Sequence, residues 1–183
     1  MNNVSIITVT VIGVVINMWA QTAEPGVTFT RVTSGPTVTD SGYTWGCAWV
    51  DYNLDGYPDL FVLGGGTGSS SEVNRLYLNN HDGTFTRMTT NEVGGLVGDR
   101  GGWFGCTWAD FNNDGWPDVY LTCNPTNALF LNLAGQGFWR AWEVGGMVTE
   151  LAHGQSASWA DYNNDGWVDL WVNDAYTPLL IFA

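Results

Sequence analysis

The sequence contains no lysine, and its only full cations are five arginines against 18 aspartate and glutamate residues. The resulting net charge of −13 gives a surface that repels phosphate backbones. Nucleic acid is therefore not expected as a partner. Divalent cations are the natural partners of such a chain.

Histidine and cysteine are also scarce. His81, in a predicted turn, and His153, at a predicted strand start, show no evident partner for acid–base chemistry. No paired carboxylates are apparent outside the repeated loops described below, so we expect no catalytic residues. The three cysteines, Cys47, Cys106 and Cys123, leave at least one thiol unpaired. A disulfide between Cys106 and Cys123 is one alternative, and buried free thiols are the favoured interpretation.

A sustained helical period is missing as well. Glycine (24) and tryptophan (11) are abundant instead, which is typical of short strands joined by tight turns. Apolar residues make up 45% of the 183 residues, which is enough for one sizeable domain with a core.

Only one segment, Val4–Ala20, is long and almost wholly apolar. Its length suits a secretory signal, and Ala20 and Ala23 are small residues of the kind found at cleavage sites. We expect a signal peptide over residues 1–23, and hence a secreted or cell-surface protein. The segment Met1-Asn2-Asn3 lacks the usual positive charge, so an uncleaved membrane anchor and a buried strand stay open. Contact with a membrane is expected only through this segment.

Three segments of the remaining chain align without gaps. Each has a Trp two residues before an Asp-rich loop, and the loops begin at Asp51, Asp110 and Asp161, spaced 59 and 51 residues apart. An Asn-x-Leu-x-Leu segment and a Phe-x-Arg segment follow each of the first two loops, and only a loose match to the first of these segments, residues 177–182, follows the third loop. The repeat region therefore spans residues 24–183, with repeat one at 43–89, repeat two at 101–142 and a partial repeat three at 153–183.

Each repeat reads as four antiparallel strands, the unit of a propeller blade. An apolar strand precedes the loop, a second follows it, and the Leu-x-Leu and Phe-x-Arg segments supply the third and fourth. Residues 27–33 carry one further Phe-x-Arg strand before the first repeat. The sequence thus predicts an all-β partial propeller of about three blades. Open edges in such a partial propeller favour aggregation.

The loops carry a pattern of hard oxygen donors. Side-chain oxygens recur at positions 1, 3, 5 and 9, a glycine at position 6 permits a sharp turn, and the carbonyl at position 7 can add an oxygen. Carboxylate and amide oxygens without His or Cys select calcium. The predicted ligands, one site per loop, are Asp51, Asn53, Asp55, Tyr57 and Asp59; Asp110, Asn112, Asp114, Trp116 and Asp118; and Asp161, Asn163, Asp165, Trp167 and Asp169.

The loop pattern has two other interpretations. An EF-hand begins with a similar pattern but needs a Glu at position 12, where this chain has Val62, Leu121 and Val172. The flanking segments are also predicted strands and not helices. The loops could instead be turns capped by Asp and Asn, but three identical four-ligand patterns disfavour that.

These residues carry a family resemblance. The loop Asp-x-Asn-x-Asp-Gly-x-x-Asp-Leu, followed by Asn-x-Leu-Tyr-Leu-Asn-Asn-x-Asp-Gly-Thr-Phe-Thr, resembles the FG-GAP/VCBS repeats of integrin α-subunit propellers. It is closer still to the secreted bacterial ASPIC/UnbV and cartilage acidic protein type. The resemblance covers residue 27 to the C-terminus and implies a propeller, typically seven-bladed, with calcium in the loop between a blade's first two strands. The repeat count here suggests a fragment of such a propeller, with further blades in a longer chain.

The function expected from these features is that of a calcium-binding extracellular module that recognises a protein or glycan, with structural calcium. A structural or assembly segment of a larger secreted protein is the alternative, and an enzyme-associated propeller is the least favoured. Trp103, Trp139 and Trp142 could stack on sugars, but packing between blades is the interpretation we favour for them.

Overall fold

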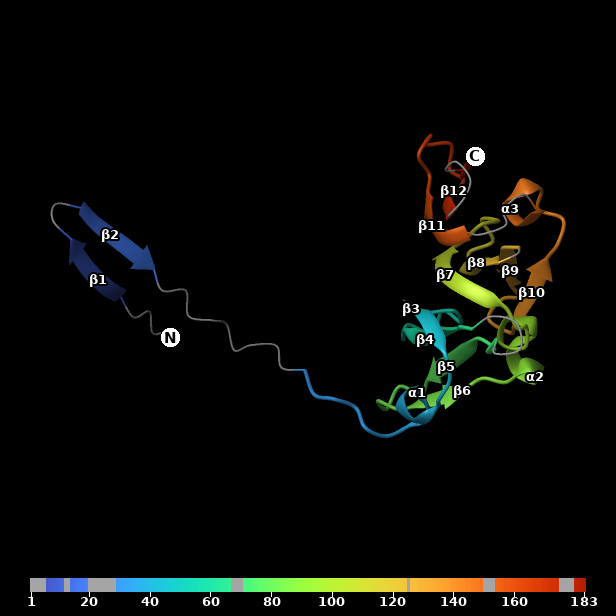
Figure 1. Cartoon of the computed structure of the whole chain (residues 1–183), viewed down its shortest axis with the longest axis horizontal. Coiled ribbons are helices and arrows are strands. Elements are labelled where there is room, and N and C mark those ends of the chain that lie inside the picture. The colour runs from blue at the N-terminus through green and yellow to red at the C-terminus, as the bar shows by residue number, and fades with distance from the viewer. Residues whose placement is uncertain are drawn as a thin grey trace. The chain divides into compact units, whose positions relative to one another are not determined.

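The computed structural model describes residues 6–11, 14–19, 29–66, 71–124, 126–149, 154–174 and 180–183. The chain divides into two compact units, residues 1–32 and 33–183 (Figure 1). In the first unit, β1 (Ile6–Val11) pairs antiparallel with β2 (Val14–Trp19). The hairpin falls within the predicted signal peptide, which stays a prediction. No helix in the described residues is long and apolar enough to span a membrane.

Three antiparallel sheets make up the second unit, and each follows chain order. The first contains β3 (Thr44–Val50), β4 (Asp59–Gly64), β5 (Arg75–Asn79) and β6 (Phe85–Arg87). The second contains β7 (Gly102–Ala109), β8 (Asp118–Asn124), β9 (Ala128–Asn132) and β10 (Phe138–Ala141). The third contains β11 (Gly154–Ala160), β12 (Asp169–Asp174) and β13 (Leu180–Phe182). The prediction of an all-β fold built from antiparallel sheets is confirmed.

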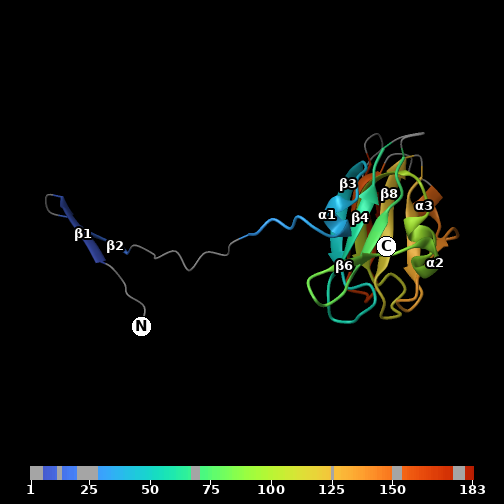
Figure 2. The same cartoon turned by 90° about the horizontal axis from the view of Figure 1, so that it is seen from below.

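Short helical turns, which the sequence did not predict, lie before the first sheet of the second unit and between its sheets. They are α1 (Pro36–Thr39), α2 (Thr90–Val93), the 3-10 turn η2 (Gly95–Val97) and α3 (Gly146–Thr149). Figure 2 shows α2 and α3 along the same side of the sheets. Helices of four residues are too short to show a helical period, so periodicity could not have revealed them.

The second strand of each repeat is the most deeply buried. Every residue of β8 except Asn124 is buried, and β4 is buried at alternate positions and at its end. Strand β8 is rich in Val, Leu and Tyr because neighbours cover both of its faces. The first strands instead carry a bulge at one equivalent position, between Thr44 and Gly46, Trp103 and Gly105, and Gly154 and Ser156.

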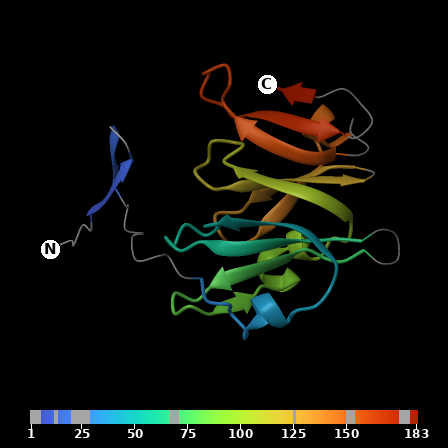
Figure 3. The ribbon, with the colours of Figure 1, turned by 60° about the vertical axis from the view of Figure 1, so that its left-hand side comes forward.

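Consecutive sheets pack on one another through aromatic side chains. Figure 3 shows the sheets stacked in chain order. The ring of Trp108 in β7 meets Phe61 of β4 edge-on, with centroids 5.4 Å apart. Trp159 in β11 meets Tyr120 of β8 in the same way at 6.1 Å. The Trp that precedes the second loop and the Trp that precedes the third therefore each pack against the second strand of the preceding sheet.

Residues 27–33 were expected to form a strand. Residues 29–33, the described part of this segment, form no strand, so the prediction is wrong for them within this chain. The physical reason is pairing: a fourth strand needs the third strand of its own blade as a neighbour, and the first sheet already has one in β6. In the described residues the third sheet has three strands and no fourth.

The three cysteines are free thiols. Cys123 is buried, and burial raises the pKa of the Cys106 thiol to about 12, with a smaller contribution from nearby Cys47. The favoured prediction of free thiols therefore holds, although Cys47 is exposed rather than buried.

The tryptophans singled out in the sequence separate into two groups. Trp103 is buried in the core, as expected. Trp139 and Trp142 are 53% and 62% exposed, so packing between blades is wrong for them. Trp142 instead lies under the guanidinium of Arg140, 4.1 Å from the ring centroid.

The aromatic contact between sheets predicts a large effect of truncation. Phe61→Ala removes a fully buried ring that contacts Trp108 and should lower the free energy of unfolding by about 3–5 kcal/mol. Trp139→Ala, at an exposed position, is the control and should change it by about 0.5 kcal/mol or less. Urea denaturation measures both, and equal losses would contradict this account of the core.

Candidate metal centre

The Asp-rich loops join the first two strands of each sheet and lie on one side of the stack (Figure 3). The second and third loops are in contact, and the first loop contacts the end of β9 in the second sheet. Asn113 Nδ2 of the second loop donates to the carbonyl oxygen of Gly166 in the third, 3.1 Å away. Asn132 Nδ2, at the end of β9, donates to the carbonyl oxygen of Tyr52 in the first loop at 2.8 Å. The structure therefore places the predicted ligands along one continuous edge.

Position 1 of each loop holds the curl together. In the first loop, Asp51 Oδ1 accepts from the N–H of Asp55 at 3.0 Å, and Oδ2 accepts from the N–H of Gly56 at 2.8 Å. Asp110 and Asp161 accept the equivalent pairs at 2.8–3.1 Å. A carboxylate that receives two N–H groups fixes the chain reversal between positions 1 and 6.

Positions 3 and 5 complete the cluster. Asn53 Oδ1 accepts from the same N–H of Asp55 at 3.2 Å, and its Nδ2 donates to Asp55 Oδ2 at 2.9 Å. Asp55 Oδ1 then accepts from the N–H of Tyr57 at 2.9 Å. The other loops repeat this pattern with Asn112 and Asp114, and with Asn163 and Asp165. The structure thus brings the side chains of positions 1, 3 and 5 together in all three loops.

The backbone of the curl explains the glycine at position 6. Gly56, Gly115 and Gly166 have φ of 89°, 92° and 91°, a region that side chains strongly disfavour. Position 4 is also left-handed, with φ of 55° at Leu54, 56° at Asn113 and 60° at Asn164. Asparagine tolerates this conformation, whereas Leu54 is an uncommon residue for it.

Position 9 begins the second strand and is buried in every repeat. Asp118 Oδ2 accepts from the N–H of Phe111 in the loop at 3.0 Å, and Oδ1 accepts from the N–H of Asn132 at 2.7 Å. Asp59 Oδ1 accepts from Asn79 in the same way, and Asp169 Oδ2 accepts from Tyr162. Asp118 therefore ties the loop to the third strand, while Asp59 makes the strand bond and Asp169 the loop bond, a role that the sequence had not indicated.

Burial makes two of these carboxylates, those of Asp59 and Asp118, costly to ionise. It raises the pKa of Asp59 and of Asp118 to about 6. The nearby acidic residues of each loop add to that rise, while backbone N–H donors oppose it. Asp59 Oδ2 is buried and has no hydrogen-bond partner with good geometry. A bound cation would favour the ionised form and supply the missing partner.

Position 7 is predicted to bind the ion through its backbone carbonyl oxygen and not through a side chain. The N–H groups of Tyr57, Trp116 and Trp167 donate to the aspartate at position 5. Their carbonyl oxygens stay predicted ligands.

The first loop has a neighbour that sequence reasoning missed. His81, at φ 64° in the turn between β5 and β6, places Nε2 3.0 Å from Asp55 Oδ2. The ring of Tyr57 stacks on His81 with centroids 3.8 Å apart. Burial alone would raise the pKa of Asp55, but hydrogen bonds from His81, Asn53 and Tyr57 bring it below its ordinary value. The expectation that His81 lacks a partner is wrong, because residues 26 positions apart meet only in the fold.

The donor chemistry of each loop suits a hard cation. No group of three or more His, Cys, Asp or Glu side chains in the described residues is placed to hold a metal ion, so Asn and backbone oxygens would have to contribute. Each loop has such donors in its amide at position 3 and its carbonyl at position 7. A set of carboxylate, amide and carbonyl oxygens is the set that calcium accepts.

Asn132 offers a test of how the loop edge is held. Asn132→Ala removes two hydrogen bonds from Nδ2, to Tyr52 and Pro117, and one to Oδ1 from the N–H of Gly135. Because the site is buried, the loss should be about 1–3 kcal/mol in free energy of unfolding. Asn79→Ala, the same position in the first repeat, is half-exposed and should cost less, because water can replace its bonds. Denaturation in chelator separates this effect from metal binding, and equal costs would refute the explanation.

Comparison with known proteins agrees with the repeat pattern. A family model for the FG-GAP-like repeat matches residues 51–121 and 110–172, which include all three loops. No curated protein matches the chain. Repeats of this family are of the propeller type, in agreement with the stacked antiparallel sheets. The chain therefore belongs to the FG-GAP-like repeat family.

Proposed function

We propose that this chain is an extracellular calcium-binding module whose loop edge supports recognition of a protein or glycan. The observation that carries the proposal is the identity of the three curls. Each gathers Asp, Asn and Asp at positions 1, 3 and 5 through the same hydrogen bonds, on one side of the sheets. Turns that needed only a cap would not require the same three acceptors in every repeat.

Electrostatics support a bound cation. Each loop holds three aspartates within nine residues, in a chain of net charge −13. Asp51, Asn53, Asp55, the carbonyl of Tyr57, and Asp59 would hold the ion in the first loop, with the equivalent residues in the other two. Calcium supplies positive charge that offsets carboxylate repulsion, and its contribution is structural. Because position 9 also bonds the third strand, a cation held there would link the loop to the sheet.

Exposed aromatic rings, two of them in the loops, support a recognition role. Tyr57 and Trp167 are exposed at position 7 of their loops, and Trp139 and Trp142 are exposed on and beside β10. Aromatic faces on a surface of this kind suit sugar rings or protein side chains. The proposal assigns no catalytic residue.

The location and a second function follow from separate observations. FG-GAP repeats are typical of extracellular proteins, and the apolar segment 4–20 suits export. Secretion or cell-surface display is therefore part of the proposal. A structural or assembly role in a larger secreted protein is the second candidate, and the uncovered faces of the first and third sheets favour it.

Calcium titration tests the metal sites directly. Calorimetry should give about three sites per chain, and calcium should raise the melting temperature relative to chelator, because ligand binds only the folded loops. Asp114→Ala should remove about one site, since this exposed side chain bonds only within its own loop. Asp82→Ala, an acidic turn residue outside the loops, is the control and should leave the stoichiometry unchanged. An absence of binding, or three sites in the Asp114 variant, would reject the assignment.

Recognition is tested separately on an array of immobilised glycans in calcium. Trp142→Ala should weaken binding about five- to tenfold, because a ring exposed for stacking is lost. Leu133→Ala removes a similarly exposed apolar side chain and should have little effect. If the array binds both variants and the parent chain equally, Trp142 is not part of the recognition surface.

A further inference from the structure

The first and the third sheet each have one exposed face. The equivalent faces within the stack are buried between two sheets. Phe61 in β4 and Tyr120 in β8 are fully buried, because Trp108 and Trp159 of the following sheet lie against them. The equivalent residue of β12 is Trp171, two positions after Asp169, and it is 38% exposed. The chain thus forms the same interface between sheets twice. Its third sheet presents one side of such an interface without a partner sheet.

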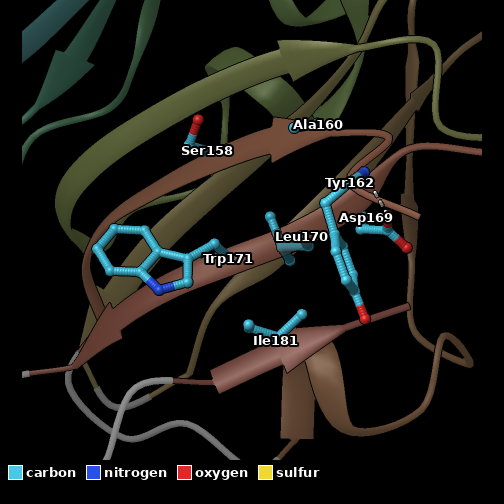
Figure 4. Close-up of a pocket in the computed structure, with 7 residues that line it drawn as sticks. All are labelled: Ser158, Ala160, Tyr162, Asp169, Leu170, Trp171 and Ile181. Carbon is cyan, nitrogen blue, oxygen red and sulfur yellow. Dashed lines mark hydrogen bonds between the residues drawn. The ribbon is translucent and has the colours of Figure 1, made fainter. Parts of the chain in front are cut away.

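The uncovered face of the third sheet is hollow and apolar. A cavity of about 520 Å³ is lined by Ser158, Ala160, Tyr162, Asp169, Leu170, Trp171 and Ile181. Figure 4 shows Trp171, Ile181 and Tyr162 around it. Tyr162 is 62% exposed, whereas its equivalent Tyr52 is buried beside Phe138 of the next sheet. Both positions hold a tyrosine, so Tyr162 is exposed because no further sheet lies against it.

The complementary half lies at the other end of the chain. Trp49 is the equivalent of Trp108 and Trp159, the two rings that fill this position between sheets. It is 62% exposed in the first sheet. One end of the repeat therefore exposes the inserting tryptophan, and the other exposes the apolar face that receives it.

A second, independent feature points the same way. In the described residues the third sheet lacks a fourth strand, while Phe29-Thr-Arg31 has the sequence of one and forms no strand. Phe29 precedes Asp51 by 22 residues, close to the 25 and 23 that separate Phe85 from Asp110 and Phe138 from Asp161. The segment therefore stands where the fourth strand of a preceding sheet belongs.

We propose that a second copy of this chain docks head to tail on the third sheet, placing its Trp49 against Trp171 and adding its segment 29–32 beside β13. The register follows from the first sheet, where the N–H of Met88 donates to the carbonyl oxygen of Leu76. The equivalent bond joins Val32 of one copy to Ile181 of the other. The interface continues one that the chain already makes twice, and it does not depend on calcium in the loops.

The contact is heterologous, since different faces of the two copies meet. Apolar burial and strand addition favour it, and the net charge of −13 on each copy opposes it. Salt screens that repulsion, so association should strengthen as ionic strength rises.

Sedimentation velocity of the full chain tests the proposal. The parent chain should associate reversibly with concentration. Trp49→Asp and Trp171→Asp should each weaken association at least about 30-fold, the effect of losing a buried aromatic anchor. Ile181→Asp changes a more exposed residue of the same face and covers the case in which the Trp171 variant fails to fold. Trp139→Asp, on neither face, is the control.

Mixing distinguishes this geometry from others. The Trp49 variant keeps an intact receiving face and the Trp171 variant an intact Trp49, so an equal mixture should regain one junction. Val32→Pro removes the N–H meant for Ile181 and should weaken association about fivefold without disturbing the isolated chain. A chain that stays monomeric throughout its soluble range, or variants that do not complement, would overturn the head-to-tail contact. An unaffected Val32 variant would overturn the strand addition.

Discussion

The buried aspartate at the start of each second strand is the constraint on which each repeat depends. Asp118 accepts one N–H from the loop and one from the end of the third strand, so three parts of the repeat meet at one carboxylate. Fixing these positions also fixes the strand register, which decides which side chains face the next sheet. Val119, the next residue, and Tyr120 are both fully buried. The loop chemistry and the packing between sheets are therefore set by the same residue.

This arrangement buries acidic groups, and burial makes their ionised form unfavourable. Burial raises the pKa of Asp118 to about 6, and Asp110 and Asp114 of the same loop add to the rise. The chain offers little compensation, because its five arginines bond elsewhere or lie outside the loops. His81 beside Asp55 is an exception confined to the first loop. A hard cation would satisfy the remaining carboxylate oxygens in all three loops at once, which is the physical reason for proposing calcium.

Most of the fold could be predicted because the repeats constrain one another. The repeated features are the Trp before each loop, the glycine at position 6 and the apolar strand after position 9. Because these features recur in all three repeats, each repeat supports the assignment of the others. Contacts that occur once had no such support. The approach of His81 to Asp55 depends on a left-handed turn, and the exposure of Trp139 and Trp142 depends on which side of an edge strand faces solvent. Sequence pattern does not decide either feature.

A stack of equivalent sheets also has a consequence for its ends. When stability comes largely from contacts between neighbouring units, an interior unit gains two interfaces and a terminal unit only one. The second sheet accordingly buries Tyr120 and half-buries Trp108, whereas the corresponding Trp171 and Trp49 are left partly in water. These exposed rings are costly to leave hydrated, and their equivalents within the stack contact another sheet. The residue positions that stabilise the interfaces within the stack thus favour association at its two ends. The two ends are complementary because each presents one side of the same kind of interface.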